Sequence, residues 1–185
     1  MYWGIYDDYT IRMLRPKGEK ALLIRALEPS YLERGIPYKI YTLNQYTDVL
    51  ELYFDDIWEI VSDRVYDRYR LFNEDMAKEL IDFINRNEFD EINVHCGAGI
   101  SRSSALMICV SKIIGKPEIE QKIYECGRFH PNKLVLSVFD EVFNGNLSKI
   151  EDTTLIHTNE DLWSKETSHC NLKENEDGSY SIILE

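Results

Sequence analysis

The sequence predicts an α/β fold, in which strands alternate with helices around a central sheet. Short apolar runs such as 92–94 alternate with longer segments of helical periodicity such as 76–84. The 185 residues fit one domain with a full hydrophobic core. From about residue 146 onward the composition becomes polar and rich in acids. We therefore expect one domain over residues 1–145 and an acidic C-terminal extension over residues 146–185.

Strands and loops are expected in the N-terminal part of the chain. Tyr9–Leu14 and Lys20–Leu27 are rich in apolar and β-branched residues, and the turn-forming segment 15–18 separates them. Residues 28–38 contain two prolines and a glycine, which predicts a surface loop. Val49–Phe54 predicts a further short strand.

Helices are expected to dominate the rest of the domain. Asn73 is a candidate N-cap, because acids follow it and apolar residues then keep helical spacing up to Asn87. Residues 103–114 are apolar almost all round, which is typical of a helix buried in the core. Two more helices are predicted over residues 117–126 and 132–143.

The C-terminal extension contains one predicted element. The turn sequence Asp177-Gly178 lies between the short runs 170–173 and 180–184, so a β-hairpin packed on or near the domain is expected. We find no catalytic signature in this extension, which favours a structural or partner-facing role.

Residues 94–103 read Val-His-Cys-Gly-Ala-Gly-Ile-Ser-Arg-Ser and carry the chemistry. Cys96 is expected at the end of a strand and Arg102 at the start of a helix. The small residues between them let several amide N–H groups face one anion, and the helix N-terminus adds to that attraction. The planar guanidinium of Arg102 can bind two phosphate oxygens at once. The pattern favours a phosphate site with a nucleophile over a cysteine that merely ends a buried strand.

The fragment His-Cys-x5-Arg-Ser resembles the signature of the cysteine-dependent protein tyrosine phosphatases. Its Ala-Gly-x-Ser-Arg-Ser part is most similar to the small dual-specificity branch and its bacterial and viral relatives. A weaker resemblance, in the order of strands and helices and in Phe54-Asp55-Asp56, extends over residues 10–143. The resemblance implies a central mixed, mostly parallel sheet flanked by helices. It also implies hydrolysis of phosphate monoesters through a cysteinyl-phosphate, without metal or cofactor.

The resemblance also assigns roles within the loop. Cys96 would be the nucleophile, because a cysteine at a helix N-terminus beside an arginine ionises readily. His95 would support the loop from behind through hydrogen bonds, a role we favour over general base. Ser103 would bond the cysteine sulfur, although a simple helix cap would also explain it. The residues expected to bind the phosphate are Gly97, Ala98, Gly99, Ile100, Ser101 and Arg102.

The general acid is an aspartate upstream of the cysteine in this family. Aligning residues 49–56 with the family's strand and loop places Asp56 at that position, with Asp55 as its close rival. Asp63 and Asp67 lie nearer to the cysteine in sequence and stay open. A solvated carboxylate is the alternative for each of them. Asn132 is expected to be a helix N-cap, although in dual-specificity relatives a Pro-Asn pair near this point helps to order the site.

The charge and composition of the chain limit the classes of binding partner and the cellular location that we expect. The net charge of −12 and a pI near 4.8 oppose binding to nucleic acids or anionic membranes. No stretch is long and apolar enough for a membrane span, and residues 1–8 do not resemble a secretory signal. The four cysteines form no Cys-x-x-Cys pair. Because a nucleophilic thiol also needs a reducing compartment, a cytoplasmic location is expected.

The expected partner is a phosphoprotein or phosphopeptide, and the oligomeric state stays open. No lysine or histidine lies within residues 97–101, which favours phosphotyrosine, with phosphoserine and phosphothreonine as further candidates, over inositol lipids or RNA ends. Three other functions are considered. The first is a phosphate-binding interaction module with little turnover. The others are a rhodanese-like sulfurtransferase, whose motif differs, and an interaction protein that acts through its extension.

Overall fold

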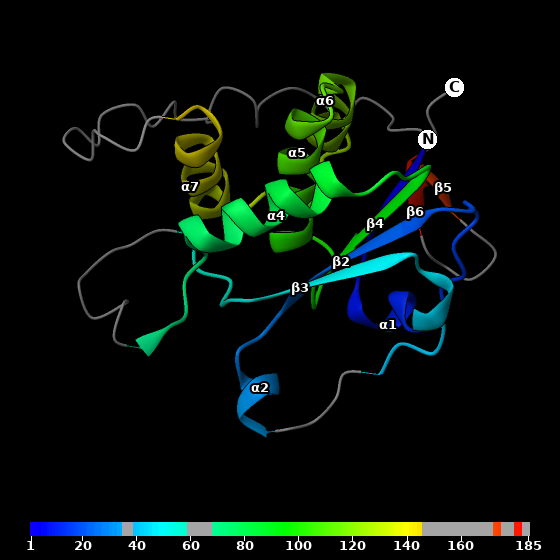
Figure 1. Ribbon diagram of the computed structural model, residues 1–185, viewed down its shortest axis with the longest axis horizontal. Helices are drawn as coiled ribbons and strands as arrows, with labels where there is room; N and C mark the ends of the chain where they lie inside the picture. Colours follow the sequence, from blue (N-terminus) through cyan, green and yellow to red (C-terminus); the bar gives the residue numbers. More distant parts are fainter. Residues whose placement is uncertain (35–38, 59–67, 146–171, 175–179, 183–185) are drawn as a thin grey trace.

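The structure is a computed structural model that describes residues 1–34, 39–58 and 68–145, together with two short strands at 172–174 and 180–182. Four parallel strands form a sheet through the middle of the molecule (Figure 1). In spatial order they are β1 (Tyr2–Tyr6), β4 (Glu91–His95), β2 (Ala21–Leu27) and β3 (Asp48–Tyr53). The α/β class with a mostly parallel sheet is confirmed. In the described residues all four strands of this sheet are parallel rather than mixed.

Helices cover both faces of the sheet (Figure 1). One side holds α4 (Glu74–Arg86), α5 (Arg102–Ile113), α6 (Pro117–Glu125) and α7 (Lys133–Phe143). The other side holds α1 (Asp8–Ile11) and the short 3-10 helix η1 (Leu43–Gln45), while α2 (Ser30–Arg34) follows β2. This arrangement leaves the carboxyl ends of the strands together at one edge, where ligands bind in open α/β sheets.

Side chains of β2 alternate between two apolar clusters. Leu22, Ile24 and Ala26 belong to the main core under α4–α7. Ala21 and Leu23 belong to a smaller cluster on the α1 side. Because a strand has a side-chain period of two, Arg25 falls on the α1 side as well, although it is buried. One central strand therefore places a buried charge under the smaller cluster.

Two predictions for the N-terminal part were wrong. Residues 9–14 form no strand; instead α1 covers Asp8–Ile11, and the Asp7 carboxylate caps it by accepting a hydrogen bond from Thr10 N at 2.7 Å. The segment 28–38 is not all loop, since it contains α2. Its residues 35–38 lie outside the described part. Strand β1 was not predicted.

The remaining helices confirm their predicted positions to within one or two residues. Asn73 caps α4 by accepting a hydrogen bond from Met76 N at 3.1 Å, and Asn87 follows its last residue. Asn132 caps α7 in the same way, through Val135 N at 3.1 Å. These caps satisfy amide groups that the first helical turn leaves unpaired.

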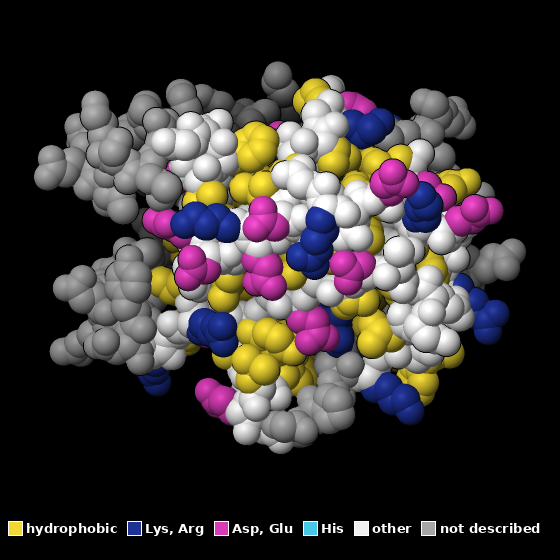
Figure 2. Space-filling view, in the orientation of Figure 1, with side chains coloured by type: hydrophobic (Ala, Val, Ile, Leu, Met, Phe, Trp, Pro, Cys, Tyr) yellow, Lys and Arg dark blue, Asp and Glu magenta, His cyan; other side chains and the backbone are white. Residues whose placement is uncertain are grey.

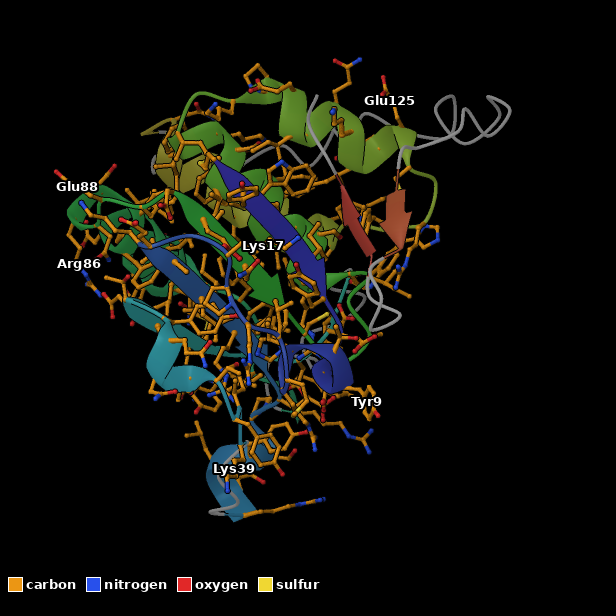
Figure 3. All side chains as sticks on the ribbon, turned by 90° about the vertical axis from the view of Figure 1, so that its right-hand side faces the viewer. Tyr9, Lys17, Lys39, Arg86, Glu88 and Glu125 are labelled. Atoms are coloured by element: carbon orange, nitrogen blue, oxygen red, sulfur yellow. The ribbon has the colours of Figure 1, made fainter. Side chains whose placement is uncertain are left out.

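Strands β5 (Leu172–Glu174) and β6 (Tyr180–Ile182) pair antiparallel, with Lys173 opposite Ser181. The pair lies beside β1, as Figure 3 shows. The residues around these two strands lie outside the described part, and the division of the chain at residue 145 stays a prediction.

Charged side chains of both signs are interspersed over the face shown in Figure 2, and neither sign gathers into a patch there. Within the described residues, no helix has the length and the apolar character needed to cross a bilayer.

Candidate active site

A small pocket opens at the carboxyl edge of the sheet. Cys96 follows the central strand β4, and the segments after the neighbouring strands β1 and β2 flank it. Figure 3 shows α1, with its labelled Tyr9, at this end of β1. The lining residues are Asp8, Ala26, Leu27, Glu28, Tyr31, His95, Cys96, Gly97 and Arg102. Parallel strand order thus brings residues from three separate parts of the chain to one cysteine.

The Cys96 side chain lies at the base of this pocket. The residue is 2% exposed, and its Sγ lies 3.2 Å from Ser103 Oγ in the first turn of α5. Its backbone N–H donates to Tyr6 O at 3.3 Å, which continues the β1–β4 pairing up to the loop. The sulfur therefore faces both the pocket and a hydroxyl that can stabilise its negative charge.

Three carbonyl groups of the loop 97–101 accept hydrogen bonds from other segments of the chain. Gly97 O accepts from Asp8 N at 3.1 Å, Ile100 O from His130 N at 3.2 Å, and Ser101 O from Asn132 N at 3.3 Å. The amide N–H groups of residues 97–101 donate no hydrogen bond to any described residue. Unpaired amides at the start of a long helix are suited to binding an anion.

Gly99 fixes the shape of this loop. Its φ of +68° lies in the left-handed region. A Cβ at this position would lie 2.7 Å from the backbone of both Tyr6 and Asp7. Glycine is therefore required both by the backbone conformation and by the close contact with the end of β1.

Arg102 begins α5 and is 4% exposed. Its Nη1 donates to Phe54 O at 3.0 Å, which anchors the guanidinium to the segment after β3. Its Nη2 lies 3.7 Å from Glu28 Oε1. Its Nε is buried and has no hydrogen-bond partner in the part of the chain that the structure describes. A buried donor of this kind calls for a further acceptor, and a phosphate oxygen would supply one.

The structure separates the two leading candidates for the general acid. Asp56 Oδ1 accepts hydrogen bonds from Ser101 Oγ at 2.7 Å and from Asn132 Nδ2 at 2.8 Å. Asp56 Oδ2 lies 3.9 Å from Arg102 Nε. Asp55 is engaged elsewhere: its N–H donates to Arg70 O, and its carboxylate accepts from Arg70 N, both at 2.8 Å. Asp63 and Asp67 lie outside the described residues.

Asn132 links the acid candidate to the fold. Its Oδ1 caps α7, while its Nδ2 donates both to Asp56 Oδ1 and to Ile57 O, the latter at 3.1 Å. Asn132 itself is fully buried. The cap was predicted from the sequence, and its contact with Asp56 depends on tertiary packing.

His95 ends β4 directly before Cys96 and also lines the pocket. The residue is 1% exposed, and its Nε2 accepts a hydrogen bond from Arg25 Nε at 3.3 Å. Burial, followed by the charge of Arg25, lowers the pKa of His95 to about 3. At neutral pH the imidazole is therefore uncharged.

Sequence reasoning missed several residues that line the pocket, among them Asp8, Glu28 and Tyr31. They lie in or after β1 and β2, so the signal that could have found them is the carboxyl end of each parallel strand. Using that signal requires the strand order, which the sequence pattern leaves open. Among the described residues, no group of three or more His, Cys, Asp or Glu side chains is placed to hold a metal ion.

Comparison with known proteins gives limited results. No protein-family model matches the chain, and no curated protein matches it. One similar solved structure is that of the human tyrosine phosphatase-like serine/threonine/tyrosine-interacting protein. The two share 20% sequence identity over 70% of this chain and 80% of that chain, with a TM-score of 0.42. A likeness of this size assigns neither a family nor an activity.

Proposed function

We propose that this protein is a cysteine-dependent phosphatase that hydrolyses phosphate monoesters on protein, with phosphotyrosine as the first candidate and phosphoserine and phosphothreonine as further ones. One observation carries the proposal. Cys96, Gly97 and the buried Arg102 line one pocket in the described structure. The N–H groups of residues 97–101 donate no hydrogen bond to a described residue, and Arg102 Nε has no hydrogen-bond partner among them. These are the nucleophile and the donors that phosphoryl transfer needs.

The first half-reaction transfers the phosphoryl group to the enzyme. The Cys96 thiolate attacks phosphorus, so that an S–P bond forms while the P–O bond to the leaving group breaks. Asp56 gives its proton to the departing oxygen. Arg102 and the amides of residues 97–101 bind the three equatorial oxygens, where the charge of the transition state is spread.

The second half-reaction releases phosphate. Asp56, now a carboxylate, accepts a proton from the attacking water, and the S–P bond breaks to restore the thiolate. Ser103 Oγ lies 3.2 Å from the sulfur, where its hydroxyl can donate to the leaving thiolate. In this proposal the phosphate binds beside Arg102 Nη2. The same nitrogen lies 3.7 Å from Glu28 Oε1.

Turnover of p-nitrophenyl phosphate and of a matched panel of phosphotyrosine, phosphoserine and phosphothreonine peptides tests this proposal. The wild-type protein should release phosphate from the aryl ester and from at least the phosphotyrosine peptides. The Cys96→Ser variant should lose turnover, because an alcohol at this position is not ionised at neutral pH, while it keeps phosphopeptide binding.

Two results would contradict the proposal. Substantial residual turnover by Cys96→Ser would remove Cys96 as the nucleophile. Phosphopeptide binding by the wild-type protein without any hydrolysis would assign the chain to phosphate-binding modules instead. The Cys109→Ser variant is the matched control, because Cys109 is also buried but lies within α5 and away from the pocket lining.

A further inference from the structure

A row of polar side chains crosses the sheet directly behind the phosphate loop. Tyr6, His95, Arg25 and Glu51 are register partners on the four adjacent strands β1, β4, β2 and β3. Residues in register on neighbouring strands point to the same face of the sheet. For Arg25 that is the α1 side, and its side chain is only 3% exposed. A charged group buried this deeply needs partners to offset its desolvation.

Arg25 has such partners on both neighbouring strands. Its Nε donates to His95 Nε2 at 3.3 Å on β4, and its Nη1 forms an ion pair with Glu51 on β3. The other oxygen of Glu51 accepts a hydrogen bond from Tyr53 OH at 2.6 Å. Burial and Glu51 raise the pKa of Tyr53 to about 12, so its hydroxyl stays a donor at neutral pH. Arg25 is therefore held in one orientation from the edge strand.

This contact determines the tautomer of His95. A guanidinium can only donate hydrogen bonds, so the Nε2 atom that accepts from it carries a lone pair. The neutral imidazole then carries its proton on Nδ1. His95 directly precedes Cys96 in the chain, and both residues line the pocket. The orientation of His95 therefore bears on the residue that we propose as the nucleophile.

We propose that Arg25 is a positioning residue for Cys96, because its hydrogen bond to Nε2 fixes the Nδ1–H tautomer of the adjacent His95. The effect of Arg25 on catalysis rests on the proposed phosphatase function. Its effect on the reactivity of the Cys96 thiol can be tested without that function, because a thiolate reacts with an alkylating reagent without any substrate turnover.

Charged groups of both signs surround the pocket that Cys96 lines. Arg102, Asp8 and Glu28 line it as well, Asp56 lies beside Arg102, and Arg25 contacts the lining residue His95. Of these carboxylates, Glu28 and Asp56 have side chains that are 56% and 37% exposed, so solvent screens them more than it screens the buried arginines. Glu51 offsets part of the Arg25 charge from the far side.

The test is the pH dependence of Cys96 alkylation by iodoacetamide, followed by peptide mass spectrometry, in the wild type and in Arg25→Met and Arg25→Lys. The midpoint of the profile should move upward by about one pH unit in Arg25→Met, because one nearby positive charge is lost. Arg25→Lys keeps a charge and should show a smaller shift. Mass mapping separates Cys96 from the other cysteines, and burial raises the pKa of the Cys109 thiol, which keeps it unreactive.

A second measurement needs no variant that could fail to fold. In ¹⁵N-labelled wild-type protein, the ring nitrogens of His95 should show the Nδ1–H tautomer by long-range ¹H–¹⁵N correlation. An Nε2–H tautomer in the wild type would overturn the proposal. So would an unchanged alkylation midpoint in a folded Arg25→Met variant, since that result would mean a structural role only. If the wild-type protein did not hydrolyse an aryl phosphate, the proposed phosphatase function would be contradicted. The alkylation midpoint of Cys96 and the tautomer of His95 would still test the role of Arg25.

Discussion

Each side chain that we propose to take part in the reaction contacts a residue from another part of the chain or from the next turn. Ser103 faces the Cys96 sulfur, Phe54 O anchors Arg102, and Asn132 holds Asp56. Reactive groups contribute most when their neighbours fix them close to the productive geometry. The chemistry at the residue scale therefore depends on contacts between residues that are distant in sequence.

Replacement of Asp56 by Asn should remove the general acid while keeping the shape of the side chain. We expect kcat on a phosphotyrosine peptide to fall by about 10²–10⁴-fold, the usual effect of losing general acid catalysis. The wild-type rate should decrease at high pH as the acid loses its proton, and this basic limb should flatten in the variant. The measurement is the pH–rate profile of kcat for both proteins.

Asp55→Asn is the matched control for this prediction. Asp55 is adjacent in sequence, but its carboxylate accepts a hydrogen bond from Arg70 N instead of facing Arg102. Its pH–rate profile should keep the basic limb. If the limb were lost in Asp55→Asn and kept in Asp56→Asn, the two assignments would have to be exchanged.

The sequence indicated the segment from Cys96 to Arg102 as the candidate site because these residues are contiguous. A run from Cys96 to Arg102 carries its own information on spacing, small residues and helix start. The residues that complete the pocket carry no such local signal: Glu28 follows an apolar strand, and Tyr31 lies in α2. Their position beside Cys96 results from the strand order, so the candidate site could be predicted only in part.

At the scale of the elements, caps explain both a correct and a wrong prediction. Asn73 stands before acids and a clear helical pattern, so α4 was predicted with both its ends. Asp7 caps α1 in the same way, but this helix has only four residues, too few to show a helical period. Its apolar residues therefore suggested a strand. β1 is rich in aromatic residues, which favour strands, yet no turn signal marks where it begins.

Helix α7 carries a prediction of its own, because its N-cap residue also holds the acid candidate. Asn132→Ala should lower the free energy of unfolding by about 1 kcal/mol through loss of the cap. It should also lower kcat/KM on phosphotyrosine peptides, because Asp56 loses the amide that donates to its Oδ1 at 2.8 Å. Urea unfolding and steady-state kinetics measure the two effects.

Asn132→Ser separates these effects. A serine can cap a helix nearly as well as an asparagine, but it lacks the amide that reaches Asp56. The stability of Asn132→Ser should therefore stay close to that of the wild type, while kcat/KM falls as in Asn132→Ala. Full activity in the serine variant would show that the cap alone accounts for the role of Asn132.

For the whole molecule, the buried row beneath the loop makes stability depend on pH. The pKa of His95 is lowered to about 3 in the folded protein, below its usual value of 6.5. Between these two values the unfolded chain binds a proton that the folded protein does not bind. Stability is therefore full above about pH 6.5 and decreases toward pH 3, by about 1.4 kcal/mol per pH unit from this group alone.

Urea unfolding at pH 7 and pH 5 measures this dependence. The difference in unfolding free energy between the two pH values should be about 2 kcal/mol smaller in His95→Gln, which keeps a neutral polar side chain at this position. An equal difference in both proteins would show that His95 does not take part in the acid destabilisation.

The contact of Gly99 with Tyr6 and Asp7 has a consequence for how the protein assembles during synthesis. β1 is made before its partner strand β4, which follows about 90 residues later. Between them the ribosome must release the whole of β2, β3 and α4. The segment of β1 therefore waits without this partner, and the pocket takes shape only when that early segment meets the late loop.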